Sequence, residues 1–517
     1  MAWLLLFSVF IISTCGLVYE LIAGALASYL LGDSITQFST VIGVYLFSMG
    51  IGSFLSKYAK KNLVLLFIEV EILIAIVGGS SSAILFLVFE HVTSFRIILY
   101  ALVSITGTLV GLEIPILMRI LKDKFQFQDL VSQVFTFDYV GALIASLLFP
   151  LILVPHLGLI RTSFFFGILN VLVAIWAIKM VAREKKWGQG LFIFALFTLA
   201  YLIIGFSFGD RILETAEASS FQDKVIYSAS SQYQRIVATQ GKQDFRLFLN
   251  GNLQFSTKDE YRYHEALVHP GLASIANPKS VLILGGGDGL AAREVLKYPS
   301  VESITLVDLD GHMTKLFKNN SLLTRFNLDS LNSPKVQVIN DDAFLWIKST
   351  NQQFDFAVID FPDPSNFSLG KLYSLSFYRA LAKKIRAGGK VVVQSTSPYF
   401  ARKSYWIVVN TLKEAGFKTA PYHVNVPSFG EWGFVIGVRT DATTGNAQNI
   451  HDAQNSYEGY SFPKSLPTGL RFLDLANLKT LFEFPIDMAE LNTPVNRLNN
   501  QILVRTFDEE WSKVVSH

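Results

Sequence analysis

Seven apolar runs fill the first 208 residues of this 517-residue chain and restrict what that part can fold into. A helix of about 20 apolar residues crosses about 30 Å of hydrocarbon, and each run approaches or exceeds that length. Because lipid offers the backbone no hydrogen-bond partners, such segments must be helical. We therefore predict an all-α polytopic membrane bundle of about seven helices over residues 1–208. The runs lie at 3–31, 36–56, 62–89, 96–119, 129–154, 157–180 and 191–208.

The overall composition supports a chain with a membrane part and a second part. Hydrophobic residues make up 51% of the sequence, which is too apolar for one soluble protein, and the length is too great for one domain. The first run is too long for a cleaved signal peptide, so we expect it to be retained. A net charge of +3 gives no electrostatic support for a nucleic-acid partner. The single cysteine, Cys15, cannot form an intrachain disulfide.

The rest of the chain has an α/β pattern. Residues 224–256 alternate in the manner of strands and contain the turn signal Asn250-Gly251, which predicts a small antiparallel sheet within a β domain at 221–278. Strands then alternate with helical segments at 290–297, 376–387 and 402–415, which predicts a Rossmann-like, methyltransferase-type domain over 279–440. The remaining residues, 441–517, are expected to form a polar linker and a docking tail.

A strand, a glycine-rich turn and a helix follow one another from Val281 to Val295. The glycine loop is formed by Gly285, Gly286, Gly287 and Gly289. Glycines there allow a nucleoside ligand to approach the backbone closely. Asp288 lies inside the turn, where a carboxylate would repel a pyrophosphate and attract a cationic ligand. A helix N-cap role is the alternative for this aspartate.

Four more acids follow predicted strands. Because ligand sites in open α/β sheets lie beyond the carboxyl ends of the strands, these acids should converge with Asp288 on one crevice. Several carboxylates around one pocket favour a polycationic substrate. The alternative for each is an ordinary turn residue or a structural carboxylate. The four acids are Asp308, Asp342, Asp360 and Asp363.

An ordered set of motifs resembles the spermidine synthase (polyamine aminopropyltransferase) family, and the apolar half resembles its membrane-bound branch. The resemblance covers about 200 residues and ends around Gly433-Phe434. It rests on Tyr233-Gln-Arg-Ile236, Leu249-Asn-Gly-Asn-Leu-Gln254, Asp259-Glu-Tyr-Arg-Tyr-His-Glu265, Gly285-Gly-Gly-Asp-Gly289 and the loop Asp360-Phe-Pro-Asp-Pro364.

The resemblance implies aminopropyl transfer from decarboxylated S-adenosylmethionine to a polyamine such as putrescine, giving spermidine and methylthioadenosine. It implies no permanently bound cofactor, a lipid bilayer and a polyamine as partners, and a homodimer as a further possibility. Asp360 would be the general base and Tyr263 its partner at the reacting amine. The expected donor contacts are Gln234, His264, Asp288, Asp308 and Asp342, and Gln254 and Asp363 would support the pocket.

One loop departs from the family pattern. Soluble members usually carry a tyrosine on the acceptor side, whereas residues 426–434 here are shorter and contain Phe429. The acceptor amine therefore stays open. Two other functions also stay open: an S-adenosylmethionine-dependent methyltransferase, and a membrane polyamine transporter or sensor whose second part only binds. We predict no metal site, because no Cys/His cluster has metal-ligand spacing.

The side of the membrane is predicted differently by two arguments. Lysines and arginines gather after the second, fourth and sixth runs. Because loops rich in these residues usually face the cytoplasm, these three loops are predicted to be cytoplasmic. With seven spans, the α/β part would then lie on the outside. The supply of the donor favours a cytoplasmic α/β part in a multi-pass protein of the cell membrane. Acids within the apolar half are candidates for a cation or polyamine path, with helix packing as the alternative. They are Glu20, Glu69, Glu71, Glu113 and Asp138.

Overall fold

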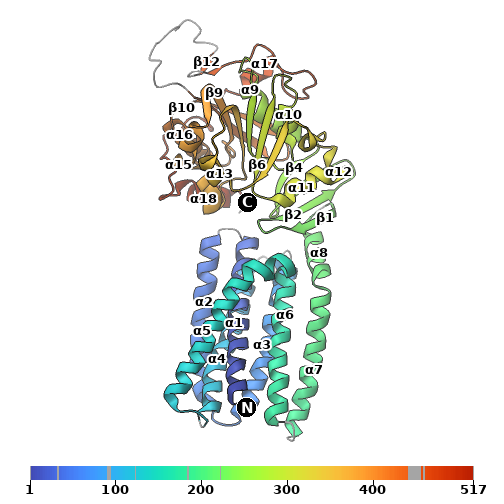
Figure 1. Cartoon of the computed structure of the whole chain (residues 1–517), viewed down its shortest axis with the longest axis vertical. Coiled ribbons are helices and arrows are strands. Elements are labelled where there is room, and N and C mark those ends of the chain that lie inside the picture. The colour runs from blue at the N-terminus through green and yellow to red at the C-terminus, as the bar shows by residue number, and fades with distance from the viewer. Residues whose placement is uncertain are drawn as a thin grey trace. The chain divides into compact units, whose positions relative to one another are not determined.

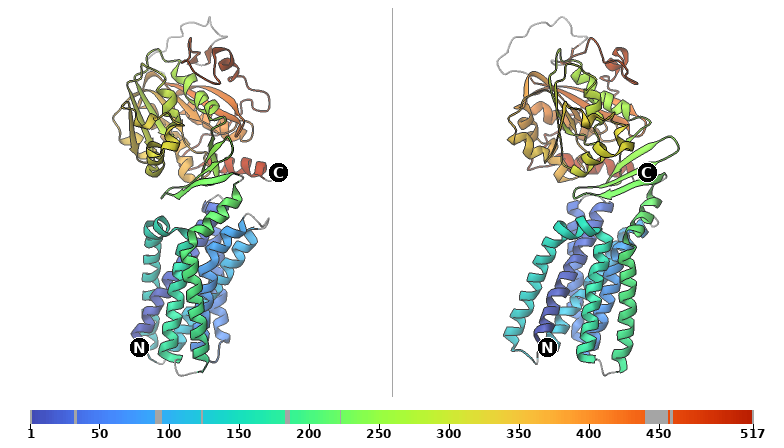
Figure 2. Two further views of the ribbon diagram at one scale, coloured as in Figure 1. Left: turned by 90° about the vertical axis from the view of Figure 1, so that its right-hand side faces the viewer. Right: turned by 45° about the vertical axis from the view of Figure 1, so that its right-hand side comes forward.

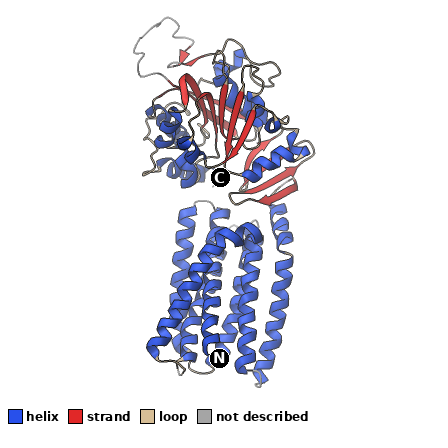
Figure 3. Cartoon of the chain, viewed as in Figure 1, coloured by secondary structure: helices blue, strands red, loops and turns tan. Residues whose placement is uncertain are grey.

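The computed structural model describes residues 2–31, 34–89, 95–122, 124–182, 186–221, 223–439, 456–457 and 460–515. The chain forms two compact units, Met1–Ser230 and Ser231–His517. The first is almost entirely helical, and the second contains most of the strands (Figure 3). We call them the helical unit and the α/β unit.

Long apolar helices make up the helical unit, and each overlaps one run predicted from the sequence (Figure 1). They are α1 (Ala2–Leu31), α2 (Ser34–Leu55), α3 (Leu63–Phe89), α4 (Phe95–Leu121), α5 (Phe127–Leu148), α6 (Val154–Ala177) and α7 (Lys186–Ser207). Shorter segments are η1 (Ser56–Tyr58), η2 (Phe149–Leu153), η3 (Ile178–Ala182) and α8 (Gly209–Ser220).

Within the described residues, six helical segments are long and apolar enough to cross a membrane. One of them, Phe127–Met180, has 54 residues and contains both α5 and α6. Its helical backbone is interrupted at Gly158, where φ is 69°. The structure thus contains the predicted α-helical bundle, and the number of membrane crossings stays a prediction.

A small sheet precedes the main one along the chain. Its order is β1-β2-β3-β4, and β2, β3 and β4 pair antiparallel, which confirms the predicted antiparallel sheet. Asn250 and Gly251 form the tight turn between β3 and β4, both with positive φ. The strands are β1 (Lys224–Ser230), β2 (Arg235–Gln240), β3 (Phe245–Leu249) and β4 (Asn252–Ser256).

The main sheet has seven strands in the order β10-β11-β9-β8-β5-β6-β7. The strands from β9 to β7 pair parallel, and β11 pairs antiparallel with both β9 and β10. This confirms the predicted Rossmann-like fold. The strands are β5 (Ser280–Gly285), β6 (Ser303–Asp308), β7 (Val336–Asn340), β8 (Phe354–Asp360), β9 (Ile385–Gln394), β10 (Phe417–Val426) and β11 (Gly430–Arg439); β12 (Ser456–Tyr457) and β13 (Tyr460–Ser461) form a separate pair.

Helices cover both faces of the main sheet, as the turned views show (Figure 2). The first and longest on one face, α9 (Glu260–Leu272), packs on β8 to β11 and on α10 (Leu290–Val295). On the other face α15 (Leu375–Ala382) contacts α13 (Ala343–Ser349) and α16 (Arg402–Glu414), and α16 contacts α18 (Ile502–Val515). The remaining helical segments are α11 (Gly311–Asn319), α12 (Ser321–Thr324), η4 (Ser330–Asn332), α14 (Phe367–Gly370), η5 (Lys371–Tyr373) and α17 (Leu475–Thr480).

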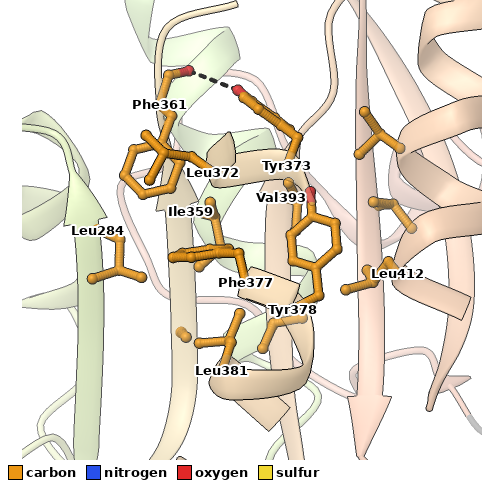
Figure 4. Packing of buried hydrophobic residues seen from close by; sticks show 14 of the residues in the cluster. Leu284, Ile359, Phe361, Leu372, Tyr373, Phe377, Tyr378, Leu381, Val393 and Leu412 are labelled. Atoms are coloured by element: carbon orange, nitrogen blue, oxygen red, sulfur yellow. Dashed lines mark hydrogen bonds between the residues drawn. The ribbon is translucent and has the colours of Figure 1, made fainter. Parts of the chain in front are cut away.

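The core beside β8 and β9 fixes the loop that follows β8. Ile359 and Val393 are fully buried and pack with Phe377 of α15 (Figure 4). The hydroxyl of Tyr373 donates to the carbonyl of Phe361 at 3.1 Å and to that of Pro362 at 3.0 Å. The residues directly after Asp360 are therefore tied to the core through their backbone.

One boundary predicted from the sequence is wrong. The predicted helix 376–387 ends at Ala382. Strand β9 already begins at Ile385, before the glycine pair at 388 and 389. Gly388 has φ of 73°, and the β8–β9 register shifts between Phe354 and Phe356. The glycines therefore form an irregularity inside a strand, because pairing with β8 outweighs their tendency to end it.

The C-terminal segment docks on the α/β unit through backbone groups. The carboxylate of Glu265 in α9 accepts the N–H groups of Arg471, Phe472 and Leu473 at 2.7 to 2.9 Å. The carboxylate of Glu510 accepts from the first turn of α16 at Ser404. Most of the predicted linker, 441–465, lies outside the described residues, so the domain boundaries stay predictions.

We expect a fragment beginning at residue 210 to fold without the helical unit. It retains β1 beside β2, whereas a fragment beginning at Ser231 exposes the edge of β2, and open strand edges promote aggregation. Size-exclusion chromatography and urea unfolding should show a soluble, cooperative 210–517 fragment and a less stable 231–517 fragment. Aggregation of the longer fragment, or equal stability of the two, would contradict this expectation.

Candidate active site

The carboxyl ends of β5 and β8 meet at the centre of the main sheet, where Gly285 pairs with Asp360. The strand order turns here: β6 and β7 follow β5 on one side, and β8 and β9 follow on the other. Ligand crevices in open α/β sheets form at such a switch point. The glycine loop and the Asp360 loop therefore border the same region.

Two glycines of the loop are required by the close approach of neighbouring groups. Gly285 has φ of 83°, and a Cβ there would lie 2.1 Å from the carbonyl oxygen of Asp360. A Cβ on Gly287 would lie 2.7 Å from Asp308 Oδ2, to which its own N–H donates at 3.1 Å. The glycine loop thus brings backbone, Asp308 and Asp360 together without side chains between them.

Asp360 and Tyr263 form a short, direct contact. The Tyr263 hydroxyl donates to Asp360 Oδ1 at 2.6 Å, although the two residues are 97 positions apart. Asp360 is 5% exposed, and burial raises the pKa of its carboxyl to about 6, partly offset by His264. Burial beside Asp360 also raises the pKa of Tyr263 well above its ordinary value. The pair therefore combines a neutral donor with a carboxylate poised to take a proton near neutral pH.

His264 is held in one orientation by a buried ion-pair network. Its Nδ1 lies 2.8 Å from the Glu260 carbonyl and 2.9 Å from Glu260 Oε2, and Arg293 pairs with both oxygens of that carboxylate. Burial opposes a charge on His264, but the hydrogen bond to Glu260 outweighs it and raises the pKa of His264. The network occupies Nδ1, and no described hydrogen bond involves Nε2.

Asp288 serves the local backbone and also faces the charged cluster. Its Oδ1 accepts the Leu290 N–H at 2.9 Å, but the N-cap residue of α10 is Gly289 and not Asp288. The side chain is nearly inaccessible, and burial raises the pKa of Asp288, with His264 opposing that shift. One oxygen thus stabilises the start of α10, and Asp288 interacts electrostatically with His264 and Asp360.

Asp308 is the last residue of β6, Asp310 follows it, and the two have different hydrogen-bond partners. Asp308 accepts from Gly287 and from the Asp310 N–H at 2.8 Å, and burial raises its pKa to about 6. Asp310 accepts from Gln234 Nε2 at 2.9 Å and from Ser231 at 2.8 Å. The sequence prediction missed Asp310, whose signal was a second acid directly before a helix. Gln234 is therefore brought to the site by Asp310.

Asp342 is engaged by a lysine. Lys371 Nζ donates to Asp342 Oδ2 at 2.6 Å, and the other oxygen caps α13 at Phe344. Burial opposes ionisation, but the hydrogen bond from Lys371 prevails and lowers the pKa of Asp342. Asp342 lies at the end of β7, next to β6, and no described hydrogen bond joins it to the Tyr263–Asp360 pair.

Asp363 belongs to a second polar network behind the Asp360 loop. Gln394 Nε2 donates to Asp363 at 3.2 Å and to the Phe361 carbonyl at 2.7 Å, while Trp432 donates to Gln394 Oε1 at 3.1 Å. Burial raises the pKa of Asp363 to about 7. Gln254, by contrast, is a half-buried residue of β4, and no described hydrogen bond links it to these groups.

Comparisons with known proteins assign this arrangement to a family. A model described as "Spermine/spermidine synthase domain" matches residues 260–449. A polyamine aminopropyltransferase of Leptospira interrogans is 51% identical over 508 residues, 98% of each chain. Polyamine aminopropyltransferase 2 of Ralstonia nicotianae is 49% identical and covers 99% of each chain. The chain belongs to the polyamine aminopropyltransferase family.

A more distant relative and one solved structure extend the comparison. The polyamine aminopropyltransferase of Mycobacterium tuberculosis is 34% identical over 96% of this chain and 94% of its own. A crystal structure of spermidine synthase in complex with the transition-state analogue AdoDATO is 24% identical, with a TM-score of 0.44, over 51% of this chain and 86% of that chain.

Three aromatic side chains pack beside the Tyr263–Asp360 pair. The Tyr263 ring lies 5.3 Å from Phe434 and 6.2 Å from Phe429, and Phe429 lies 5.3 Å from Trp432. Ser428 is fixed by two hydrogen bonds to the Asp259 carboxylate at the start of α9, at 2.7 and 2.9 Å. Phe429 has no hydroxyl, in contrast to a tyrosine, so this loop supplies an aromatic ring without a hydrogen-bonding group at its tip.

Proposed function

We propose that this chain transfers an aminopropyl group from decarboxylated S-adenosylmethionine to a polyamine acceptor such as putrescine and releases methylthioadenosine. The observation that carries the proposal is the 2.6 Å contact between Tyr263 and Asp360 beside the glycine loop. Full-length relatives named polyamine aminopropyltransferase, 49% and 51% identical, support the same reaction.

The proposed reaction is a direct displacement at carbon. The acceptor nitrogen attacks the propyl carbon bonded to sulfur, the C–S bond breaks, and its electron pair converts the sulfonium into the thioether of methylthioadenosine. The amine must lose a proton, because alkyl amines titrate near 10.4 and are mostly protonated at neutral pH. Asp360 accepts this proton while Tyr263 orients the nitrogen. Since the leaving group is already activated, most of the rate comes from alignment.

The acids around the glycine loop suit the donor in this proposal. Asp288 would face its free amine, Asp308 its ribose hydroxyls, and His264 and Gln234 the remaining polar groups. Asp342 would share its Lys371-bound carboxylate with the adenine amine. Gln254 and Asp363 would support the acceptor side. No cluster of three or more metal-ligating side chains occurs among the residues described.

The activity should fall on the acid side of pH 6. Burial raises the pKa of Asp360 to about 6, so below that pH the carboxyl is protonated and cannot accept the amine proton. A profile of kcat/KM between pH 5 and 9 should rise through an apparent pKa near 6 and then follow deprotonation of the amine. A value of kcat/KM that does not fall below pH 6 would show that Asp360 is not the proton acceptor.

The choice of donor tests the proposal against methyl transfer. The carboxylate of S-adenosylmethionine would lie close to Asp288, and like charges in contact cost several kcal/mol, which corresponds to about 100-fold or more in rate. Incubated with either donor and putrescine, the enzyme should react with the decarboxylated one only. Methylated amine formed from S-adenosylmethionine would favour the methyltransferase.

The proposal places the helical unit in the cell membrane as a multi-pass anchor. Six described segments have the length and composition for it. The α/β unit would face the cytoplasm, where the donor is made. With seven crossings, the count of basic residues between the helices points to the opposite side, so this placement depends on donor supply.

A further inference from the structure

The carboxylate of Asp259, at the start of α9, binds the turn between β10 and β11. Its Oδ2 accepts the Ser428 N–H at 2.7 Å, and its Oδ1 accepts the Ser428 hydroxyl at 2.9 Å. The two residues are 169 positions apart, and Asp259 is only 6% exposed. A buried carboxylate that receives two hydrogen bonds from one residue holds the two elements in a fixed relation.

Asp259 does not cap its own helix. It occupies the N-cap position of α9, where an aspartate ordinarily accepts an N–H of the first turn, yet no described hydrogen bond joins its side chain to α9. Asp474, the N-cap residue of α17, does accept the N–H groups of Ala476 and Asn477 in its own helix, at 2.9 and 2.7 Å. The carboxylate of Asp259 therefore serves the β10–β11 turn and not the helix that it precedes.

The β10–β11 turn has a defined backbone. Val426 pairs with Gly430 across the hairpin, and the Phe429 N–H donates to the Val426 carbonyl at 2.8 Å. Pro427 is the second residue of this four-residue turn, where its fixed φ is favoured, and Gly430 has φ of 80°. The shape of the turn thus comes from its own sequence, and the Asp259–Ser428 contact fixes its position relative to α9.

The turn carries Phe429 next to the residue that the proposed reaction assigns to the acceptor nitrogen. The centroid of the Phe429 ring lies 6.2 Å from that of Tyr263, whose hydroxyl donates to Asp360, and 5.3 Å from that of Trp432. Any shift of the turn relative to α9 would therefore change the packing of Phe429 on Tyr263.

We propose that Asp259 is a positioning residue that makes the reaction selective for the length of the acceptor amine. By holding Ser428 it fixes Phe429 beside Tyr263, and the fixed ring limits how an aliphatic diamine extends from its reacting nitrogen. One methylene more or less in an apolar pocket changes kcat/KM by about 10- to 200-fold when the side chains around it cannot yield. This inference rests on the proposed function, because it concerns the amine acceptor of that reaction.

The test compares acceptors of increasing length. The purified full-length protein is assayed for kcat/KM with diaminopropane, putrescine and cadaverine at saturating decarboxylated S-adenosylmethionine. The wild type should prefer one of these diamines over the others by at least about 10-fold. Asp259→Ala removes both hydrogen bonds and should reduce this preference to about 3-fold or less, with the KM of the donor unchanged.

Further variants separate the contact from the stability of α9. Ser428→Ala removes the hydroxyl and keeps the N–H, so an intermediate preference is expected, and this variant decides the question if Asp259→Ala does not fold. The double variant should match Asp259→Ala, because the serine hydroxyl has no partner once the carboxylate is gone. Asp474→Ala is the matched control: it removes an N-cap aspartate that binds its own helix, and should keep the wild-type preference.

The inference is overturned by a wild type that does not distinguish the diamines or by variants that keep the wild-type preference. A loss in Asp259→Ala that is equal for all diamines, or that is accompanied by a higher KM for the donor, would also overturn it and would show that Asp259 only supports α9. A wild type that forms no polyamine from any diamine contradicts the proposed function and this inference with it. Product formation with unchanged preference contradicts only the role of Asp259.

Discussion

The Asp360→Asn variant is expected to lose turnover by about 10²- to 10⁴-fold, the usual contribution of a positioned general base. The amide keeps an oxygen that accepts from the Tyr263 hydroxyl, so the 2.6 Å contact and the fold can survive. It cannot take the proton of the attacking amine. Single-turnover formation of methylthioadenosine measures the effect, and near-wild-type turnover would remove Asp360 from the mechanism.

A stability measurement separates chemistry from misfolding in this variant. Burial raises the Asp360 pKa from 3.8 to about 6, so the folded state binds the proton more tightly than the unfolded state. Stability from this group is therefore present at low pH and lost as pH rises through about 6. The shift corresponds to at most about 3 kcal/mol and the loss extends from about pH 4 to about pH 6, so Asn should stabilise the 210–517 fragment fully at pH 8 and about half as much at pH 5.

Asp355→Asn is the matched control. Asp355 lies on the same strand β8 but pairs with Arg386 and accepts the Lys279 and Ser280 N–H groups, away from the switch point. This variant should keep its turnover. An equal loss of turnover in both variants would mean that damage to β8, and not the missing base, is responsible.

Asp288→Asn is expected to weaken binding of decarboxylated S-adenosylmethionine by about 10- to 100-fold, which corresponds to loss of a charged hydrogen bond of 1.5–3 kcal/mol. Asp288→Lys should have a larger effect. The asparagine variant is cleaner, because its side-chain oxygen still accepts the Leu290 N–H and preserves the start of α10. Calorimetry on the purified protein measures the change.

Methylthioadenosine is the internal control for Asp288. It has no charge at sulfur and no propylamine, so its affinity should change little in Asp288→Asn. Equal losses for the two ligands would show that Asp288 only supports the loop, and its hydrogen bond with the Leu290 N–H would then explain this aspartate.

Local signals in the sequence predicted the positions of the strand-end residues well. Asp308 and Asp360 end strands β6 and β8, and Asp288 lies in the loop after β5. Because β5 lies between β6 and β8 in the sheet, these strand ends must meet. Sequence spacing could not predict that Tyr263 contacts Asp360, because the two residues are 97 positions apart. Only the family resemblance predicted that Tyr263 and Asp360 act together. Their contact depends on how α9, which carries Tyr263, packs across four strands.

Other features depend on tertiary contacts that no local pattern encodes. The Lys371–Asp342 ion pair and the Asp310–Gln234 hydrogen bond each join separate elements. The predicted end of the helix before Gly388 and Gly389 was wrong, because β9 pairs with β8 from Ile385 onward despite the glycines that follow.

The most direct test of the central claim is a product balance on the purified full-length protein. Decarboxylated S-adenosylmethionine labelled in its aminopropyl carbons is incubated with unlabelled putrescine. The products should be labelled spermidine and unlabelled methylthioadenosine in equal amounts. Other amines in place of putrescine would define the acceptor that the Phe429 loop admits. Tight binding of donor and amine with no labelled polyamine formed from any acceptor would contradict the account and identify the α/β unit as a binding domain only.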